Sequence, residues 1–165
     1  RVAALIDGIE TELTQEGAKI DQALDVLKRA TLRDNRFRRA AVDRSREERP
    51  YLLDYAGGAM RLTGLTMLQI QDEAGRIISS GHFRNEYDRL DPELPKLLAS
   101  APGGTAMIRV RAPDAPFLAL ACIDSLDMGD RRFRIVAGVK IGSDKRSASC
   151  SPAGSCTPQT DPVRW

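Results

Sequence analysis

The sequence predicts an α+β domain in which one long N-terminal helix precedes a five-stranded antiparallel sheet. Three observations predict this. Apolar residues recur at helical spacing between Val2 and Ala30, two short β-type runs flank an Asp-Glu-Ala-Gly turn at residues 72–75, and three more β-type runs end before Gly142. Because a helical segment separates the second run from the third, the expected order is strand, strand, helix, strand, strand, strand.

The composition is that of one globular domain with appendages. The chain has 165 residues, of which 42% are hydrophobic and 29% are charged, and its net charge is +2. So small a net charge argues against general attraction to nucleic acid. No apolar run approaches the roughly 18 residues of a membrane-spanning helix. The chain begins with Arg1 rather than Met, so we expect a piece of a longer protein.

Residues 1–50 are predicted to be a long helical region. Apolar side chains recur every seven residues in its first part, at Ile6, Leu13, Ile20 and Leu27. Such spacing places one stripe along the helix and predicts a homodimer through these four side chains. The alternative is a helix that lies on the domain's own sheet. The two are compatible if one end dimerises while the other packs inward.

The second part of this region, Lys28–Arg49, carries nine Lys or Arg against four Asp or Glu. A basic helix can bind anionic lipid or nucleic acid, but we favour a solvated helix face and expect no nucleic-acid partner. Pro50 is expected to end or interrupt the helix, because proline disfavours helical geometry in the residue before it. Tyr51–Tyr55 is then a short helix or turn. Glycines mark a flexible entry to the sheet domain, residues 51–142, at Gly57, Gly58 and Gly64.

The first two strands are predicted to form a hairpin. Leu65–Gln71 and Arg76–Ser80 are the strands, and Asp72–Gly75 is the turn, in which glycine is free to take positive φ. A helix is expected over Asp91–Ala101, with Asp91 as its N-cap and Pro92 as its first helical residue.

Three further strands complete the sheet, at Thr105–Arg111, Phe117–Asp124 and Phe133–Ile141. The first alternates, so that Ile108 and Val110 share one face and Arg109 and Arg111 share the other. The second is apolar on both faces, which predicts a strand covered on both sides, and Ser125–Asp130 is the turn after it. The third places its apolar residues on one face: Phe133, Ile135, Ala137, Val139 and Ile141.

The three cysteines fall into two settings. Cys122 lies in an apolar run and is predicted to be a buried thiol. Cys150 and Cys156 lie in residues 143–165, which are rich in Ser and Pro and are predicted to be a disordered tail. They are either a local disulfide or two free thiols. One His and three scattered Cys lack the spacing of a zinc site, so no metal and no cofactor are expected.

Residues 68–98 read LQIQDEAGRIISSGHFRNEYDRLDPELPKLL. Together with the helix before them and the strands after them, they resemble the extracytoplasmic PAS-like sensor domains, of the single-Cache or PDC type, of bacterial sensor histidine kinases. The resemblance covers residues 2–142. It implies a periplasmic domain held between two membrane helices, which senses a ligand or environmental state and relays it through its N-terminal helices. The tail departs from the family, which would lead to a second membrane helix soon after Ile141.

The resemblance implies a kinase parent but no catalysis by this chain. Neither a phosphoacceptor-histidine helix nor a Gly-rich ATP-binding box is present in the sequence, and His82 lies in a loop-like context. We therefore expect a non-catalytic sensor module. Chemoreceptors and cyclases use such modules too, and a domain without a ligand that docks a periplasmic protein is the alternative of another class.

If a ligand binds, we expect it between the sheet and the segment Gly81–Leu98. The candidate contacts are His82, Arg84, Tyr87, Arg109 and Arg111. Arginine suits planar anions through paired hydrogen bonds, and histidine adds a donor or a pH-sensitive charge. A small anion, such as a carboxylate, is therefore the expected ligand. The alternative is that the strand arginines form a solvated face. A sealed core would favour the docking domain, and a pocket with convergent polar groups would favour the sensor.

Overall fold

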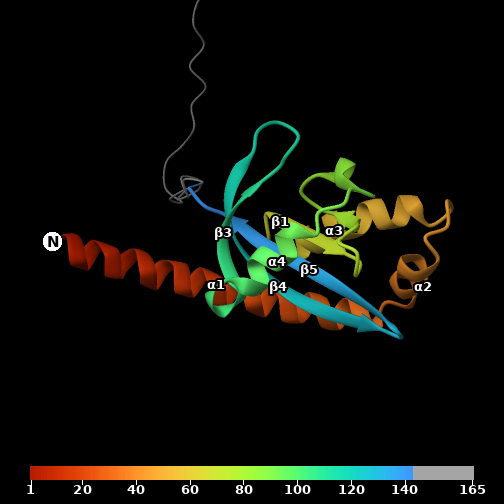
Figure 1. The fold of residues 1–165 in the computed structure, drawn as a ribbon, viewed down its shortest axis with the longest axis horizontal. Coiled ribbons are helices and arrows are strands. Elements are labelled where there is room, and N and C mark those ends of the chain that lie inside the picture. Colours follow the sequence, from red (N-terminus) through yellow and green to blue (C-terminus); the bar gives the residue numbers. More distant parts are fainter. Residues whose placement is uncertain (143–165) are drawn as a thin grey trace, which may run out of the picture.

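Helices cover both faces of a five-stranded antiparallel sheet (Figure 1). This computed structural model describes residues 1–142 of the chain, so the expectations for residues 143–165, including Cys150 and Cys156, lie outside the described residues. The elements follow in the order α1 Val2–Arg33, α2 Asn35–Asp43, α3 Arg49–Thr63, β1 Met67–Gln71, β2 Ile77–Ser80, η1 Arg84–Glu86, α4 Glu93–Ser100, η2 Pro102–Gly104, β3 Thr105–Val110, β4 Phe117–Met128 and β5 Arg131–Lys140.

The strands lie in the order β2-β1-β5-β4-β3, and each neighbouring pair is antiparallel. The last strand of the chain, β5, is therefore the central one, between β1 and β4. The first hairpin closes through a turn in which Gly75 has φ of +81°. A Cβ at this position would also lie 2.6 Å from Cα of Pro92. Both the positive φ and this close approach therefore require glycine here. The predicted five-stranded α+β fold is confirmed.

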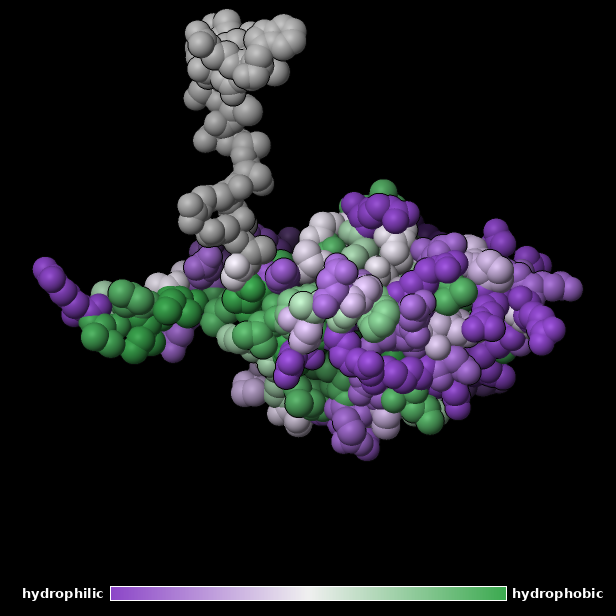
Figure 2. Space-filling model, turned by 90° about the horizontal axis from the view of Figure 1, so that it is seen from above, coloured by the Kyte–Doolittle hydropathy of each residue, from purple (hydrophilic) through white to green (hydrophobic). Residues whose placement is uncertain are grey.

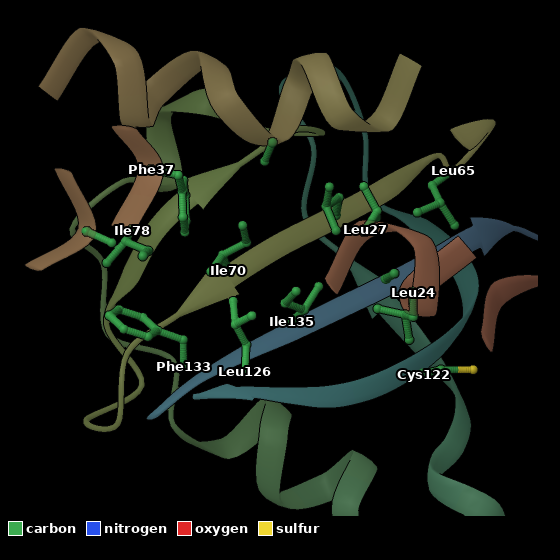
Figure 3. Packing of buried hydrophobic residues seen from close by; sticks show 14 of the residues in the cluster. Leu24, Leu27, Phe37, Leu65, Ile70, Ile78, Cys122, Leu126, Phe133 and Ile135 are labelled. Atoms are coloured by element: carbon green, nitrogen blue, oxygen red, sulfur yellow. The ribbon is translucent and has the colours of Figure 1, made fainter. Parts of the chain in front are cut away.

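Alternate residues of the strands enter two separate cores, as the period of a strand requires. Leu68 and Ile70 pack with the helices α1, α2 and α3, together with Leu126, Phe133 and Ile135 (Figure 3). Met67 and the small residues of β4 pack on the opposite face, beneath Leu98 of α4. Strand β4 contributes to both cores, as its sequence predicted. Cys122 lies in the first core, where burial raises the pKa of its thiol to about 11.

The apolar stripe of α1 is divided between the core and the surface, which corrects part of the predicted dimer seam. Ile20 and Leu27 are 1% and 6% exposed, because they pack on the chain's own sheet beside Leu24. Leu13 packs at the edge of this core. Ile6 is 50% exposed, and it belongs to an N-terminal segment that extends beyond the sheet (Figure 1). No helix within residues 1–142 combines the length and apolar character needed to cross a membrane.

The helical region is interrupted before Pro50, between Asp43 and Arg49, but Pro50 itself does not end a helix, because it lies in the first turn of α3. Proline is tolerated there, since the first helical N–H groups have no intrahelical acceptor. Gly57 and Gly58 lie inside α3 rather than in a flexible entry. The small residues Ala56 and Gly57 let α3 lie directly against the end of β2. A Cβ on Gly81, the residue after β2, would come within 2.7 Å of the Ala56 carbonyl oxygen.

Strand β4 is longer than predicted, because it continues to Met128 where a turn was expected over Ser125–Asp130. Leu126 and Met128 keep the alternation and are buried in the core beneath α1, α2 and α3. The reversal is confined to Gly129 and Asp130, since Met128 pairs with Arg131 across the hairpin. Burial of two more apolar side chains outweighs the turn preference of Ser125 and the aspartates.

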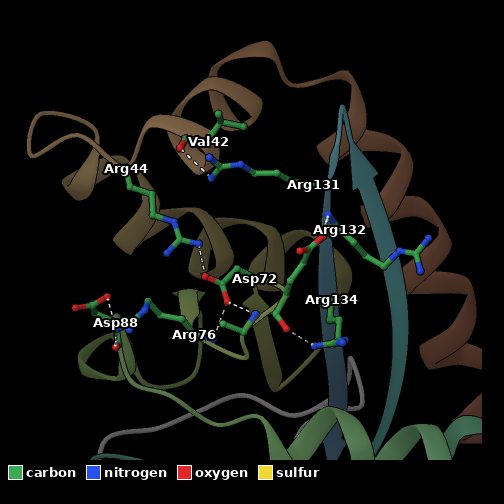
Figure 4. A network of polar contacts seen from close by, with 10 residues as sticks. Val42, Arg44, Asp72, Arg76, Asp88, Arg131, Arg132 and Arg134 are labelled. Carbon is green, nitrogen blue, oxygen red and sulfur yellow. Dashed lines mark hydrogen bonds and ion pairs between the residues drawn. The ribbon is translucent and has the colours of Figure 1, made fainter.

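Polar contacts tie the end of α2 to the tips of both hairpins (Figure 4). Arg44 donates to Asp72 in the β1–β2 turn, and Arg131 of β5 donates to the Val42 carbonyl oxygen. Arg134 donates to the carbonyl oxygen of Glu73 at 3.2 Å. Partial burial opposes ionisation of Asp72, but its hydrogen bonds from Arg44 and two backbone N–H groups outweigh burial and lower its pKa.

The division of α1 predicts a large loss of stability on truncating one of its leucines and a small change on truncating another. Leu24→Ala removes a side chain that is 2% exposed and leaves a cavity against the sheet, so it should lower the free energy of unfolding by about 2–5 kcal/mol. Leu5→Ala is the matched control, because Leu5 is 67% exposed, and it should change stability by less than about 0.5 kcal/mol. Urea unfolding measures both. Equal losses would contradict the placement of α1.

Candidate ligand-binding site

A pocket of about 380 Å³ lies on the sheet face opposite the helices α1 and α3. Its walls are β1, the segment from His82 to Leu97 and the edge strand β3. Apolar side chains make up much of the lining, at Met67, Leu94, Leu97, Met107, Ile108 and Val110. The polar lining residues are Gln69, His82, Glu86, Arg89, Asp91, Glu93, Arg109 and Arg111. An apolar pocket with several convergent polar groups is the usual form of a small-molecule site.

The carboxylate of Glu86 organises the polar end of this pocket. Its side chain is only 4% exposed. One oxygen accepts from Nη2 of Arg89 at 2.8 Å, and the other accepts from Nε2 of Gln69 at 3.0 Å. Arg89 also pairs with Asp91 at 3.2 Å. Gln71 donates to Oε1 of Gln69 at 2.9 Å and so extends the network along β1.

These partners keep Glu86 ionised despite its burial. Burial by itself raises the pKa of a carboxyl, but the hydrogen bond from His82 and the charge of Arg89 outweigh it here. The pKa of Glu86 therefore lies below its ordinary value of 4.5. The pocket thus contains a negative charge that is already neutralised by its neighbours.

His82 lies beside Glu86 and lines the pocket. Its side chain is 4% exposed, and Nε2 is 3.4 Å from Oε2 of Glu86. Its other nitrogen, Nδ1, is buried and has no hydrogen-bond partner among residues 1–142. Nε of Arg89, another pocket residue, is likewise buried and has no partner among residues 1–142. Buried polar atoms are normally satisfied, by protein groups or by ordered water.

Arg109 and Arg111 border the pocket on the β3 side, as the sequence suggested. Both are exposed, and neither has an ion-pair partner within the described residues. Ile108 and Val110, which alternate with them, are buried beneath α4. Arg109 and Arg111 therefore alternate with the buried residues of the strand where it borders the pocket. The floor is formed from β1 and the loop after β2.

The structure places two predicted contacts outside the pocket. Arg84 pairs with Asp54 of α3 at 2.8 Å on the surface, so its guanidinium is held away from the cavity. The ring of Tyr87 packs on the core beneath α1, α2 and α3 and lies under the guanidinium of Arg49. The loop turns at η1, which sends Glu86 inward while Arg84 and Tyr87 face α3. Both were expected contacts, and neither lines this pocket.

Sequence reasoning missed the residues at the centre of the network: Gln69, Glu86 and Arg89. One signal was present. Gln69 and Gln71 alternate with Leu68 and Ile70 in a strand that is buried on both faces, and buried amides require polar partners. Asp91, the expected N-cap, instead accepts from Arg89, while Pro92 precedes the first turn of α4. Within residues 1–142 there is no group of three or more potential metal ligands.

The lowered pKa of Glu86 predicts a pH-dependent contribution to stability. Because the folded-state pKa lies below the unfolded value of 4.5, the contribution is full above pH 4.5 and is lost as the pH falls through the lowered pKa. Glu86→Gln should therefore lower the free energy of unfolding by about 1–3 kcal/mol at neutral pH, and by progressively less in acid. Glu93→Gln is the control, because Glu93 is exposed and its one ion-pair partner among residues 1–142 is Lys96. A difference from wild type that stays constant in acid would contradict the prediction.

No protein family and no curated protein sequence matches the chain. Solved structures do. The sensor domain of E. coli DcuS aligns with 76% of this chain and 91% of its own, at 13% identity and a TM-score of 0.52. The sensor domain of the V. cholerae histidine kinase DctB aligns with 85% of this chain and 57% of its own, at 13% identity and a TM-score of 0.49. The chain has the PAS-like α+β fold of the DcuS sensor domain.

Proposed function

We propose that this chain is the extracytoplasmic sensing domain of a membrane-anchored sensor histidine kinase and that it detects a small anion. The observation that carries the proposal is the pocket: on a fold shared with a sensor domain, polar groups converge on a cavity of about 380 Å³. Its position under α4 is consistent with a ligand-binding role. A domain that only docks a protein partner would not need this cavity.

The charges of the pocket support an anionic ligand. Arg109 and Arg111 border the pocket and have no ion-pair partner among residues 1–142. Of the acidic lining residues, Glu86 and Asp91 share the guanidinium of Arg89, and Glu93 is paired with Lys96. A carboxylate-sized anion fits this arrangement, because guanidinium groups bind planar anions through paired hydrogen bonds. The apolar lining from α4 and β3 would cover the rest of a small organic molecule.

The long helix supports a relay to the rest of the protein. The C-terminal half of α1 packs on β4 and β5, the strands whose other face looks toward α4. Its N-terminal segment carries exposed apolar side chains at Val2, Leu5, Ile6 and Ile9, which gather on the projecting end of the helix (Figure 2). Two such segments pairing in a homodimer would pass a displacement of the sheet toward the membrane.

A screen of small anions tests the ligand. Thermal unfolding in the presence of acetate, sulfate and a panel of organic acids should reveal at least one stabilising anion. Arg109→Gln should weaken its binding by about tenfold or more, since a charged hydrogen bond contributes about 1.5–3 kcal/mol. Arg84→Gln is the matched control, because Arg84 lies outside the pocket, and it should leave binding unchanged. Absence of stabilisation across a broad panel would rule out the anion sensor.

Sedimentation tests the dimer. Wild type should associate with increasing concentration, and Ile6→Glu combined with Ile9→Glu should remain monomeric, because two charges would be buried in the pairing of α1. Val26→Glu is the control, since Val26 is exposed on another side of the same helix, and it should associate like wild type. Equal association of all three proteins would place the contact elsewhere.

A further inference from the structure

We propose that the anion sensed by this domain is carried on an extended peptide. The peptide adds to the free edge of β3 as a further antiparallel strand and places acidic side chains opposite Arg109 and Arg111. The inference rests on the proposed anion sensor and specifies the class of its ligand. Three observations carry it: the register of β3, the course of the pocket and the alternation of side chains along this strand.

The register of the sheet shows which backbone groups of β3 are already used. Ile141 donates its N–H to the carbonyl oxygen of Leu118 at 2.9 Å, so Leu118 directs its backbone groups toward β5. Successive residues of a strand direct these groups to opposite sides. Ala119 therefore bonds to β3, where Ile108 is its partner. It follows that Ile108 uses its N–H and C=O groups in the ladder with β4.

Met107 and Arg109, on either side of Ile108, consequently direct their N–H and C=O groups to the open edge of the sheet. Among residues 1–142, no other strand or loop forms backbone hydrogen bonds with them. The opposite edge is closed, because Ile77 of β2 donates to the Arg89 carbonyl oxygen at 2.9 Å and accepts from the Asp88 N–H at 2.8 Å. An uncovered edge is a template for another strand, and β3 is the edge left open.

The pocket follows this open edge. Five consecutive residues line it, from Met107 to Arg111, although the side chains of a strand alternate between two faces. Ile108 and Val110 are buried on the face that α4 covers, so Met107 and Arg109 belong to the other face. A cavity that reaches both sets touches the strand along its edge, where the free N–H and C=O groups lie.

The side chains of β3 define the pattern of the partner. Residues opposite one another in neighbouring strands share a face and interact. Arg109 and Arg111 are exposed, and neither has an ion-pair partner within the described residues. The peptide residue between their two partners would lie opposite Val110, on the side where Leu94 and Leu97 line the pocket. Acidic residues that alternate with apolar ones therefore fit this edge.

A second copy of this chain fits the same edge less well. Pairing β3 with its own copy would bring the arginines of both chains into one short ladder, and neighbouring like charges oppose pairing. The acidic pocket residues Asp91 and Glu93 do not offset this repulsion, because they are paired with Arg89 and Lys96. The charge of the edge favours an acidic partner.

The probe is a short synthetic peptide in which glutamate alternates with valine, and NMR of the whole chain follows its binding. Without peptide, the amide protons of Met107 and Arg109 should exchange rapidly with solvent, whereas that of Ile108 is protected by β4. The peptide should protect the first two. It should also bind about tenfold more tightly than a version with lysine in place of glutamate, because like charges would then lie opposite the arginines.

Two methylated versions of the peptide test the strand pairing itself. Residues whose backbone groups point toward each other in an antiparallel pair exchange both hydrogen bonds, so the glutamate opposite Arg109 carries a bonding N–H. N-methylation of the glutamates should therefore abolish binding, and N-methylation of the valines should leave it unchanged. Both versions have the same charge, so the comparison separates strand pairing from simple attraction of an anion.

Met107→Pro tests the same contact on the protein. Proline is tolerated in an edge strand where its missing N–H would face solvent, so this variant should fold and lose peptide binding. Met107→Ala is the matched control, because it retains the N–H at the same position, and it should bind the peptide like wild type.

Each outcome decides the matter. Equal binding of the two methylated peptides, or full binding by Met107→Pro, would overturn strand pairing, while stabilisation by a small organic acid would leave the anion sensor intact. Protection of Met107 and Arg109 that grows with protein concentration alone would assign the edge to a second copy and overturn the peptide. If neither the peptide nor any acid binds, sensor and peptide both fail. The methylated peptides require only wild type, so they remain decisive should Met107→Pro fail to fold.

Discussion

The burial of one ionised carboxylate, that of Glu86, constrains the architecture on the pocket side of the sheet. A buried charge is tolerated only when opposite charges and hydrogen-bond donors surround it. Here Gln69 donates from β1 and Arg89 from the following loop, and Nε2 of His82 lies 3.4 Å from Oε2 of Glu86. Satisfying Glu86 therefore holds the loop after β2 against the sheet, and this loop is the wall that turns the space beneath α4 into a pocket.

The sheet separates this polar site from the apolar packing that connects it to the rest of the molecule. On one face α1 packs on β4 and β5, and on the opposite face α4 packs on β4 and β3. Interdigitated cores deform little, so in the sensor that we propose a change at the pocket would reach α1 mainly as a movement of whole strands. The division of α1 suits this role, because its C-terminal half is fixed to β4 and β5 while its N-terminal half is free to contact another chain.

Most of the elements could be predicted from periodicity and turn chemistry, and the two main errors have different causes. Pro50 was expected to end or interrupt a helix but lies in the first turn of α3, because proline suits the start of a helix as well as the residue after its end. Ser125 was expected in a turn but lies within β4, where burial of Leu126 and Met128 outweighs its turn preference. The seven-residue spacing in α1 identified an apolar stripe correctly. It left open whether a second chain or the chain's own sheet covers Ile20 and Leu27, because one stripe suits either neighbour.

The sequence by itself determined the order of the elements, the faces of the strands and three residues of the pocket: His82, Arg109 and Arg111. These follow from local sequence patterns, which do not depend on how the chain packs in three dimensions. Only the tertiary structure decided that Glu86 points inward while Arg84 and Tyr87 do not, and that Gln69 and Arg89 meet it. The physical reason is that a loop side chain has no period to orient it. Its direction is set by the partners that it meets in the fold, which are Arg89 and Gln69 for Glu86 and Asp54 of α3 for Arg84.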